Sequence, residues 1–193
     1  MSPWYAKLVF FLGVIGMAIV RAPHIKRSTA IKVVKSRNDI LDKALVAFVS
    51  LGLVLPLVWM TTSAIAIADY ALRPIPFAVG IFFFACGLWV LHRSHVDLGT
   101  NWSNTLELRE GHQLVVQGVY RRIRHPMYVA LLLYGLGQSL TLPNFIAGPS
   151  FFVPFAILVA FRMRREERMM LEKFGAEYEF YVSRTKRLVP GVW

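Results

Sequence analysis

The chain has 193 residues, of which 56% are hydrophobic and 17% are charged, and it carries a net charge of +11. The length predicts one domain, residues 1–193. A soluble domain is typically about 45–50% apolar and about 25% charged, so this composition indicates a lipid environment. Because Cys86 is the single cysteine, a disulfide framework or a thiolate metal cluster within the chain is excluded.

Five apolar stretches approach the roughly 17–25 helical residues that cross a bilayer. We therefore predict an all-α integral membrane protein with about five transmembrane helices, at about 4–20, 44–68, 75–91, 127–142 and 144–161. The first stretch lacks a basic segment before its apolar core, so we expect it to remain as an anchor and not to be cleaved as a signal peptide. Only Pro143 and Asn144 clearly separate the fourth stretch from the fifth, which predicts a tight helical hairpin.

The basic residues predict which side of the membrane each loop faces. Twenty of the 22 lysines and arginines lie in 21–43, 92–126 and 162–193, and the other two are Lys7 and Arg73. The positive-inside rule makes these three regions cytoplasmic and puts the N-terminus outside, as expected for a protein of an inner (cytoplasmic) membrane. Topology and attraction to anionic lipid headgroups then explain the net charge, and we expect no nucleic-acid partner. No two glycines are four residues apart, so no GxxxG dimer face is predicted and the oligomeric state stays open.

Two of the cytoplasmic regions concentrate polar side chains. In the tail, Arg162 and Glu166 are four residues apart and share one helical face at the membrane boundary. They are either a solvated ion pair or part of a site, since ionisable residues at that depth are site candidates. We interpret His92, His95 and Asp97 as interfacial polar residues at a helix end and predict no metal site. No GxGxxG, Walker, G-x-S-x-G or HExxH motif of a soluble enzyme occurs.

Several short motifs follow in order from residue 95 to 191. Residues 111–115, 118–120 and 124–128 read GHQLV, GVY and RHPMY, and the tail carries Arg162, Glu166-Glu167, Phe174-Gly175, Glu177-Tyr178, Tyr181 and Pro190-Gly191. This pattern resembles the isoprenylcysteine carboxyl methyltransferase family, whose superfamily includes membrane phospholipid N-methyltransferases. The run of Leu98-Gly99 and Asn101-Trp102-Ser103 is similar to that of short prokaryotic members.

The resemblance implies an S-adenosylmethionine-dependent methyltransferase built from transmembrane helices, with a cytoplasmic cofactor-binding loop and a C-terminal helix. By this resemblance, Glu166 would engage the charged amino-acid end of the cofactor, and Arg162, the implied catalytic residue, would face the methyl acceptor. The implied cofactor-binding residues are His112, Gln113, Leu114, Val115, Tyr120, His125, Pro126, Met127, Tyr128 and Glu166.

The methyl acceptor is expected to be a lipophilic small molecule or lipid that enters sideways from the membrane. Arg162 favours the carboxylate of a prenylcysteine-like or other lipophilic acid, because a guanidinium pairs with both carboxylate oxygens. The alternative is N-methylation of a phospholipid amine such as phosphatidylethanolamine. More distant alternatives are a sterol-reductase-like NADPH oxidoreductase and a non-enzymatic transporter or structural protein, although a transporter should carry ionisable residues within its helices.

Overall fold

The computed structural model describes residues 2–29, 33–36, 40–99, 107–109 and 113–191. The α-helices in these ranges are α1 (Pro3–Thr29), α2 (Ile40–Thr61), α3 (Pro74–Leu98), α4 (Pro126–Thr141), α5 (Phe152–Phe174) and α6 (Ala176–Arg184). Two short 3-10 helices are η1 (Ala66–Ala68) and η3 (Gly118–Arg121), and two strands are β1 (Val33–Ser36) and β2 (Glu107–Arg109).

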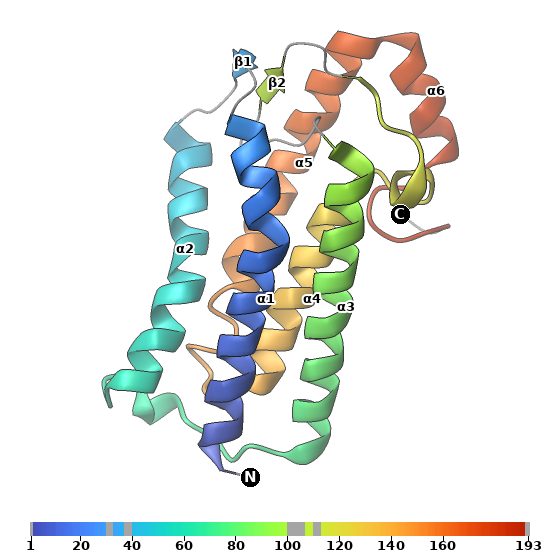
Figure 1. Cartoon of the computed structure of the whole chain (residues 1–193). Coiled ribbons are helices and arrows are strands. Elements are labelled where there is room, and N and C mark those ends of the chain that lie inside the picture. The colour runs from blue at the N-terminus through green and yellow to red at the C-terminus, as the bar shows by residue number, and fades with distance from the viewer. Residues whose placement is uncertain (1, 30–32, 37–39, 100–106, 110–112, 192–193) are drawn as a thin grey trace.

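Helices α1 to α5 form an elongated bundle (Figure 1). The chain begins at one end of it, here named the far end, while β1, β2 and α6 lie at the opposite end, here named the polar end. Strands β1 and β2 pair antiparallel, which joins the loop after α1 to the loop after α3. The all-α prediction omitted this small sheet, because strands of four and three residues leave little periodic signal.

Within the described residues, three helical segments are long and apolar enough to cross a membrane: Pro3–Ile25, Ile40–Thr61 and Pro74–Leu98. Their outer faces expose large apolar side chains; Leu12 is 57% exposed, Phe82 64% and Trp89 63%. Such a continuous apolar surface is stable against lipid and would be unfavourable in water. The structure therefore supports an integral membrane protein, and it does not confirm five spanning helices.

Helices α3 and α4 approach each other closely at glycines. A Cβ added at Gly87 would lie 2.8 Å from the carbonyl oxygen of Ala130, and one at Gly137 would lie 2.9 Å from the carbonyl oxygen of Gly80. Small residues allow backbones to meet in this way where lipid provides no hydrophobic force between helices. This contact fixes the start of α4 beside the end of α3, at the polar end.

The predicted second span, 44–68, is displaced in the structure, because α2 starts at Ile40 and ends at Thr61. The Thr62 hydroxyl donates to the carbonyl of Val58 and accepts from the amide of Ala64. Hydroxyl side chains that bond to the nearby backbone compete with helix continuation, and the chain turns into η1.

The predicted fifth span, 144–161, is wrong over its first half, since residues 144–151 form turns and α5 begins at Phe152. The side-chain carbonyl of Asn144 accepts from the amides of Ile146 and Ala147, which closes an Asx-type turn. The part of α5 before Arg162 has ten residues, from Phe152 to Phe161, and spans about 15 Å, half of a bilayer core. The turns are mostly buried in protein, as irregular backbone at membrane depth must be.

Asn144 also joins the loop after α2 to the loop after α4, at the far end. Its Nδ2 donates to the carbonyl of Ile65 at 2.8 Å and to Oδ1 of Asp69 at 2.7 Å. Trp59 Nε1 donates to the same Asp69 oxygen at 2.7 Å, and a backbone bridge links Asp69 with Asn144. We name this cluster of Trp59, Asp69 and Asn144 the far-end clip.

Candidate functional site

The site lies at the polar end, where the chain after α6 returns to the start of α4. Ile123 and Lys186 form a parallel bridge, and the amide of Arg124 donates to the carbonyl of Lys186 at 2.8 Å. The amide of His125 donates to the carbonyl of Arg187 at 3.1 Å. Pro126 then opens α4 at its first turn, where a missing N–H costs nothing. The tail thereby brings the Arg187 side chain over α5.

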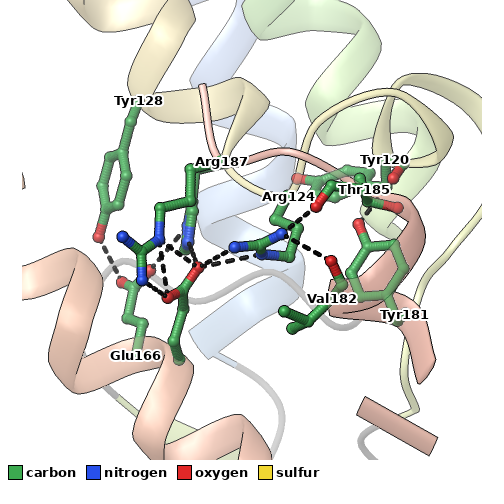
Figure 2. A network of polar contacts seen from close by, with 10 residues as sticks. Tyr120, Arg124, Tyr128, Glu166, Tyr181, Val182, Thr185 and Arg187 are labelled. Carbon is green, nitrogen blue, oxygen red and sulfur yellow. Dashed lines mark hydrogen bonds and ion pairs between the residues drawn. The ribbon is translucent and has the colours of Figure 1, made fainter. Parts of the chain in front are cut away.

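Glu167 on α5 is held by two guanidinium groups, which Figure 2 shows side by side above the helix. Arg124 donates to its Oε1 from Nε at 3.0 Å and from Nη2 at 2.9 Å. Arg187 donates to its Oε2 from Nε at 3.0 Å and from Nη2 at 2.8 Å. Burial acts to raise the pKa of Glu167, but hydrogen bonds from His125, Arg187 and Arg124 outweigh it and lower the pKa to about 2. We name Arg124, Glu167 and Arg187 the arginine clamp.

His125 lies between the two neighbouring glutamates. Its Nε2 is 3.3 Å from Oε1 of Glu167, and its Nδ1 is 3.6 Å from Oε2 of Glu166. Burial acts to lower the pKa of His125, but the two carboxylates together raise it above its ordinary value. The two carboxylates thus favour the protonated imidazolium, which carries an N–H on each ring nitrogen, one toward each glutamate.

Among the carboxylates described for the site, Glu166 has the most exposed side chain. The Tyr128 hydroxyl donates to its Oε1 at 2.5 Å, as Figure 2 shows. Burial acts to raise the pKa of Glu166, but His125, Arg162 and Tyr128 together lower it. The Glu166 side chain is 27% exposed, against 13% for Glu167. Glu166 therefore presents an ionised carboxylate at the surface of a buried network.

Arg162 lies one helical turn before Glu166, toward the bundle. Its Nε is 3.3 Å from Oε1 of Glu166 and 3.8 Å from Oδ1 of Asp42 on α2. The side chains of Arg162 and Asp42 are only 9% and 5% exposed. The guanidinium thus lies between a buried carboxylate and a partly open one.

The loop before α4 is fixed by Asp97 and Tyr181. The carboxylate of Asp97 accepts from the amide of Val119 at 2.8 Å, and the Tyr181 hydroxyl donates to the carbonyl of Tyr120 at 2.6 Å. Gly118 has φ +61°, and a Cβ there would lie 2.1 Å from Oδ2 of Asp97. Only glycine suits both the left-handed backbone and this contact.

Four of the predicted site residues converge in this network: His125, Tyr128, Arg162 and Glu166. Tyr120 and Pro126 are buried beside it, and Leu114, Val115 and Met127 are half-buried. Gln113 is exposed, and His112 lies outside the described residues. None of the polar contacts described for the network involves Leu114, Val115 or Met127, so their predicted part in cofactor binding stays a prediction.

Several residues of the network were given no role by sequence reasoning: Asp42, Arg124, Glu167, Tyr181 and Arg187. A signal for Asp42 was present, because it begins a stripe on α2 at helical spacing that continues through Leu45, Val49, Gly52 and Pro56. Arg124, Glu167 and Tyr181 belong to the quoted motifs, but the contacts among them and with Arg187 depend on the returning tail, which local spacing does not predict. Among the described residues, no group of three or more His, Cys, Asp or Glu side chains could hold a metal ion.

The fold and the site define an α-helical integral membrane protein that gathers ionisable side chains at one end of its bundle. Residues 78–172 match the model of the isoprenylcysteine carboxyl methyltransferase (ICMT) family, which supports this family for the segment that holds most of the site.

Known proteins agree with that match. The chain is 32% identical over 99 residues to protein-S-isoprenylcysteine O-methyltransferase B of Arabidopsis thaliana, covering 50% of each chain. It is 27% identical over 110 residues to protein-S-isoprenylcysteine O-methyltransferase of Schizosaccharomyces pombe, covering 56% of this chain and 47% of that one. A Delta(14)-sterol reductase of Mus musculus is 33% identical over 91 residues, covering 46% of this chain and 22% of the reductase. The chain thus spans about half the length of the methyltransferases it matches.

Proposed function

We propose that this chain belongs to the isoprenylcysteine carboxyl methyltransferase family, as a short member of prokaryotic type. In this proposal it is an S-adenosylmethionine-dependent enzyme that methylates the carboxylate of a prenylcysteine-like or other lipophilic acid. The observation that carries the proposal is the pair of Arg162 and Glu166 on one face of α5, within the segment that matches the family.

The donor set at the polar end fits the cofactor. Its ammonium needs an anion, and Glu166 offers a carboxylate that is ionised at neutral pH and partly exposed. When bound, the cofactor supplies a methyl group on a sulfonium sulfur. An acceptor oxygen can bond to the methyl carbon as the sulfur leaves. Tyr128 and His125 keep the Glu166 carboxylate oriented through their contacts with its two oxygens. His112 to Val115 remain part of the proposed cofactor site by resemblance alone.

The acceptor's carboxylate would be oriented by Arg162. A carboxylate needs no base to react, so the protein has to supply position more than proton transfer. The guanidinium is planar and can pair with both carboxylate oxygens, and it lies where α5 leaves the bundle. A lipophilic acid can reach that level from the membrane while the polar cofactor reaches Glu166 from the aqueous side.

A phospholipid amine remains the second candidate acceptor, and one observation favours it. Arg162 already faces the carboxylates of Asp42 and Glu166, an acidic setting that would attract a cation. An amine must lose a proton before it attacks, however, and the raised pKa of His125 favours its imidazolium form, which has no free lone pair to accept that proton. The carboxylate acceptor therefore remains the proposal.

The function is tested by incubating the purified protein with radiolabelled cofactor and a lipid extract. The proposal expects a lipid-soluble product that releases its label in mild alkali, as a methyl ester does. A label that resists alkali would replace the carboxylate by an amine acceptor. Binding of NADPH without methyl transfer would support the reductase class instead.

The proposed topology puts the polar end in the cytoplasm, as the distribution of basic residues predicts. In a Cys86→Ser background, a single cysteine at Ala71 should react with an impermeant thiol reagent applied to intact cells. A cysteine at Lys173, on the exposed part of α5, should react only after the cells are opened. The reverse pattern would refute the orientation.

A further inference from the structure

Helix α2 presents one face to α5, and Asp42 stands at the polar end of that face. Leu45 and Val49 pack against a buried cluster of Phe155, Leu158 and Val159 on α5. Farther along, Gly52 approaches Phe151 so closely that an added Cβ would lie 2.5 Å from its Cα. This packing fixes the height of α2 against α5. It follows that the position of Asp42 opposite Arg162 is set by the seam between the two helices.

The charge of Asp42 is buried, which makes its partner important. Its side chain is 5% exposed, and Arg162 Nε lies 3.8 Å from its Oδ1. A buried carboxylate without an opposite charge is strongly disfavoured, so Asp42 and Arg162 depend on each other. Glu166, the other carboxylate beside Arg162, also receives a hydrogen bond from Tyr128 and lies near His125. Glu166 would therefore keep these two contacts if Arg162 moved.

We propose that Asp42 is a positioning residue, which holds the Arg162 guanidinium against α2 at the membrane boundary and so presents it to the acceptor. Without the ion pair to Asp42, the guanidinium could reorient toward Glu166, one helical turn away. The inference rests on the proposed function, and it assigns part of the acceptor site to α2. Asp42 lies outside residues 78–172, so the match to the family does not include it.

The kinetic test compares Asp42→Asn, Asp42→Glu and the neighbouring control Lys43→Ala, whose side chain is exposed. The acceptor is an S-farnesyl thioether carboxylic acid presented in detergent micelles. Asp42→Asn should raise KM for this acceptor about tenfold, as expected for loss of a charged hydrogen-bond partner. The Kd of the cofactor, measured by calorimetry, should change less than about threefold, because Glu166 keeps Tyr128 and His125. Asp42→Glu should recover part of the lost affinity, and Lys43→Ala should match the wild type.

A second measurement is independent of activity. The apparent melting temperature is recorded for Asp42→Asn, Arg162→Gln and the double variant. Each single change breaks the buried contact between the two charges and should lower the melting temperature by about 6 °C or more. The double change removes both charges, so its loss should be clearly smaller than the sum of the two single losses.

Additive losses would overturn the contact between Asp42 and Arg162. Coupled losses together with an unchanged acceptor KM would overturn the positioning role, because the pair would then be structural only. The proposed function is tested separately with the wild-type protein. It fails if that protein binds the cofactor but transfers no methyl group to any lipid. In that case the coupling could persist, and the role of Asp42 toward the acceptor would be rejected with the function.

Discussion

Replacing Arg187 by alanine removes one of the two guanidinium groups of the arginine clamp. Arg187 is the anchor of the C-terminal tail, because its side chain makes contacts of 2.8 to 3.2 Å with both oxygens of Glu167. Arg124 would remain on Glu167, and the backbone bridge between Ile123 and Lys186 is not altered by the substitution. The change therefore isolates one charged contact between the tail and α5.

The size of the effect follows from the pKa of Glu167. Its hydrogen bonds outweigh the effect of burial and lower the pKa from 4.5 to about 2, which corresponds to about 3 kcal/mol of stabilisation. Three partners share this amount, and the Arg187 side chain is 34% exposed, so water screens its part to about 1 kcal/mol. For a chain of this length, we expect Arg187→Ala to lower the melting temperature by about 3 °C.

The assay is thermal unfolding in detergent at several pH values, with Lys186→Ala as the matched control. Lys186 has an exposed side chain and contributes to the tail through its backbone. Because the folded pKa of Glu167 is depressed, its stabilisation is complete above about pH 4.5 and is lost as the pH falls through about 2. The difference between wild type and Arg187→Ala should thus be largest near neutral pH and shrink in acid. An equal loss in Lys186→Ala, or no loss in Arg187→Ala at pH 7, would refute the reasoning.

Three further predictions concern the site. Glu166→Ala should raise the Kd of the cofactor at least about tenfold, since a hydrogen bond to a charged group is worth about 1.5–3 kcal/mol; unchanged affinity by calorimetry would reject this role. Arg162→Lys keeps the charge but loses the planar fork, so turnover should fall while cofactor affinity stays near wild type; full turnover would mean that Arg162 only anchors the helix end. Gly118→Ala should reduce thermal stability more than Gly191→Ala, because both glycines have positive φ but only Gly118 would meet Asp97; equal losses would show that backbone strain alone matters.

The sequence was informative where the signal is local. The fourth apolar stretch was predicted to begin at residue 127, and α4 begins at Pro126. The spacing of Arg162 and Glu166 predicted a shared helical face, and their side chains lie 3.3 Å apart. Both predictions depend on residues within one or two helical turns, where spacing alone determines geometry.

Other parts of the structure could not be predicted because they depend on distant segments. Hydropathy alone extended the fifth span to residue 144, although the Asn144 side chain closes a turn with the following amides and α5 begins only at Phe152. The contact between Asp42 and Arg162 depends on how α2 and α5 pack. The return of Arg187 to Glu167 likewise depends on the parallel bridge between Ile123 and Lys186 after α6. No local pattern in the residues around 187 predicts this bridge.

The far-end clip has a consequence for how a bulky lipid chain enters the protein. Trp59 lies near the end of α2 and Asn144 lies just before α5 begins, and both bond to Asp69. The end of α2 is thus tied at the far end to the segment that leads into α5, whereas at the polar end α2 and α5 are joined by the longer pair of Asp42 and Arg162, 3.8 Å apart. Because the clip restrains the far end, we expect any separation of α2 from α5 to be smallest there and largest beside Arg162. A hydrocarbon tail would then slide in from the bilayer with its polar head already at the level of the guanidinium.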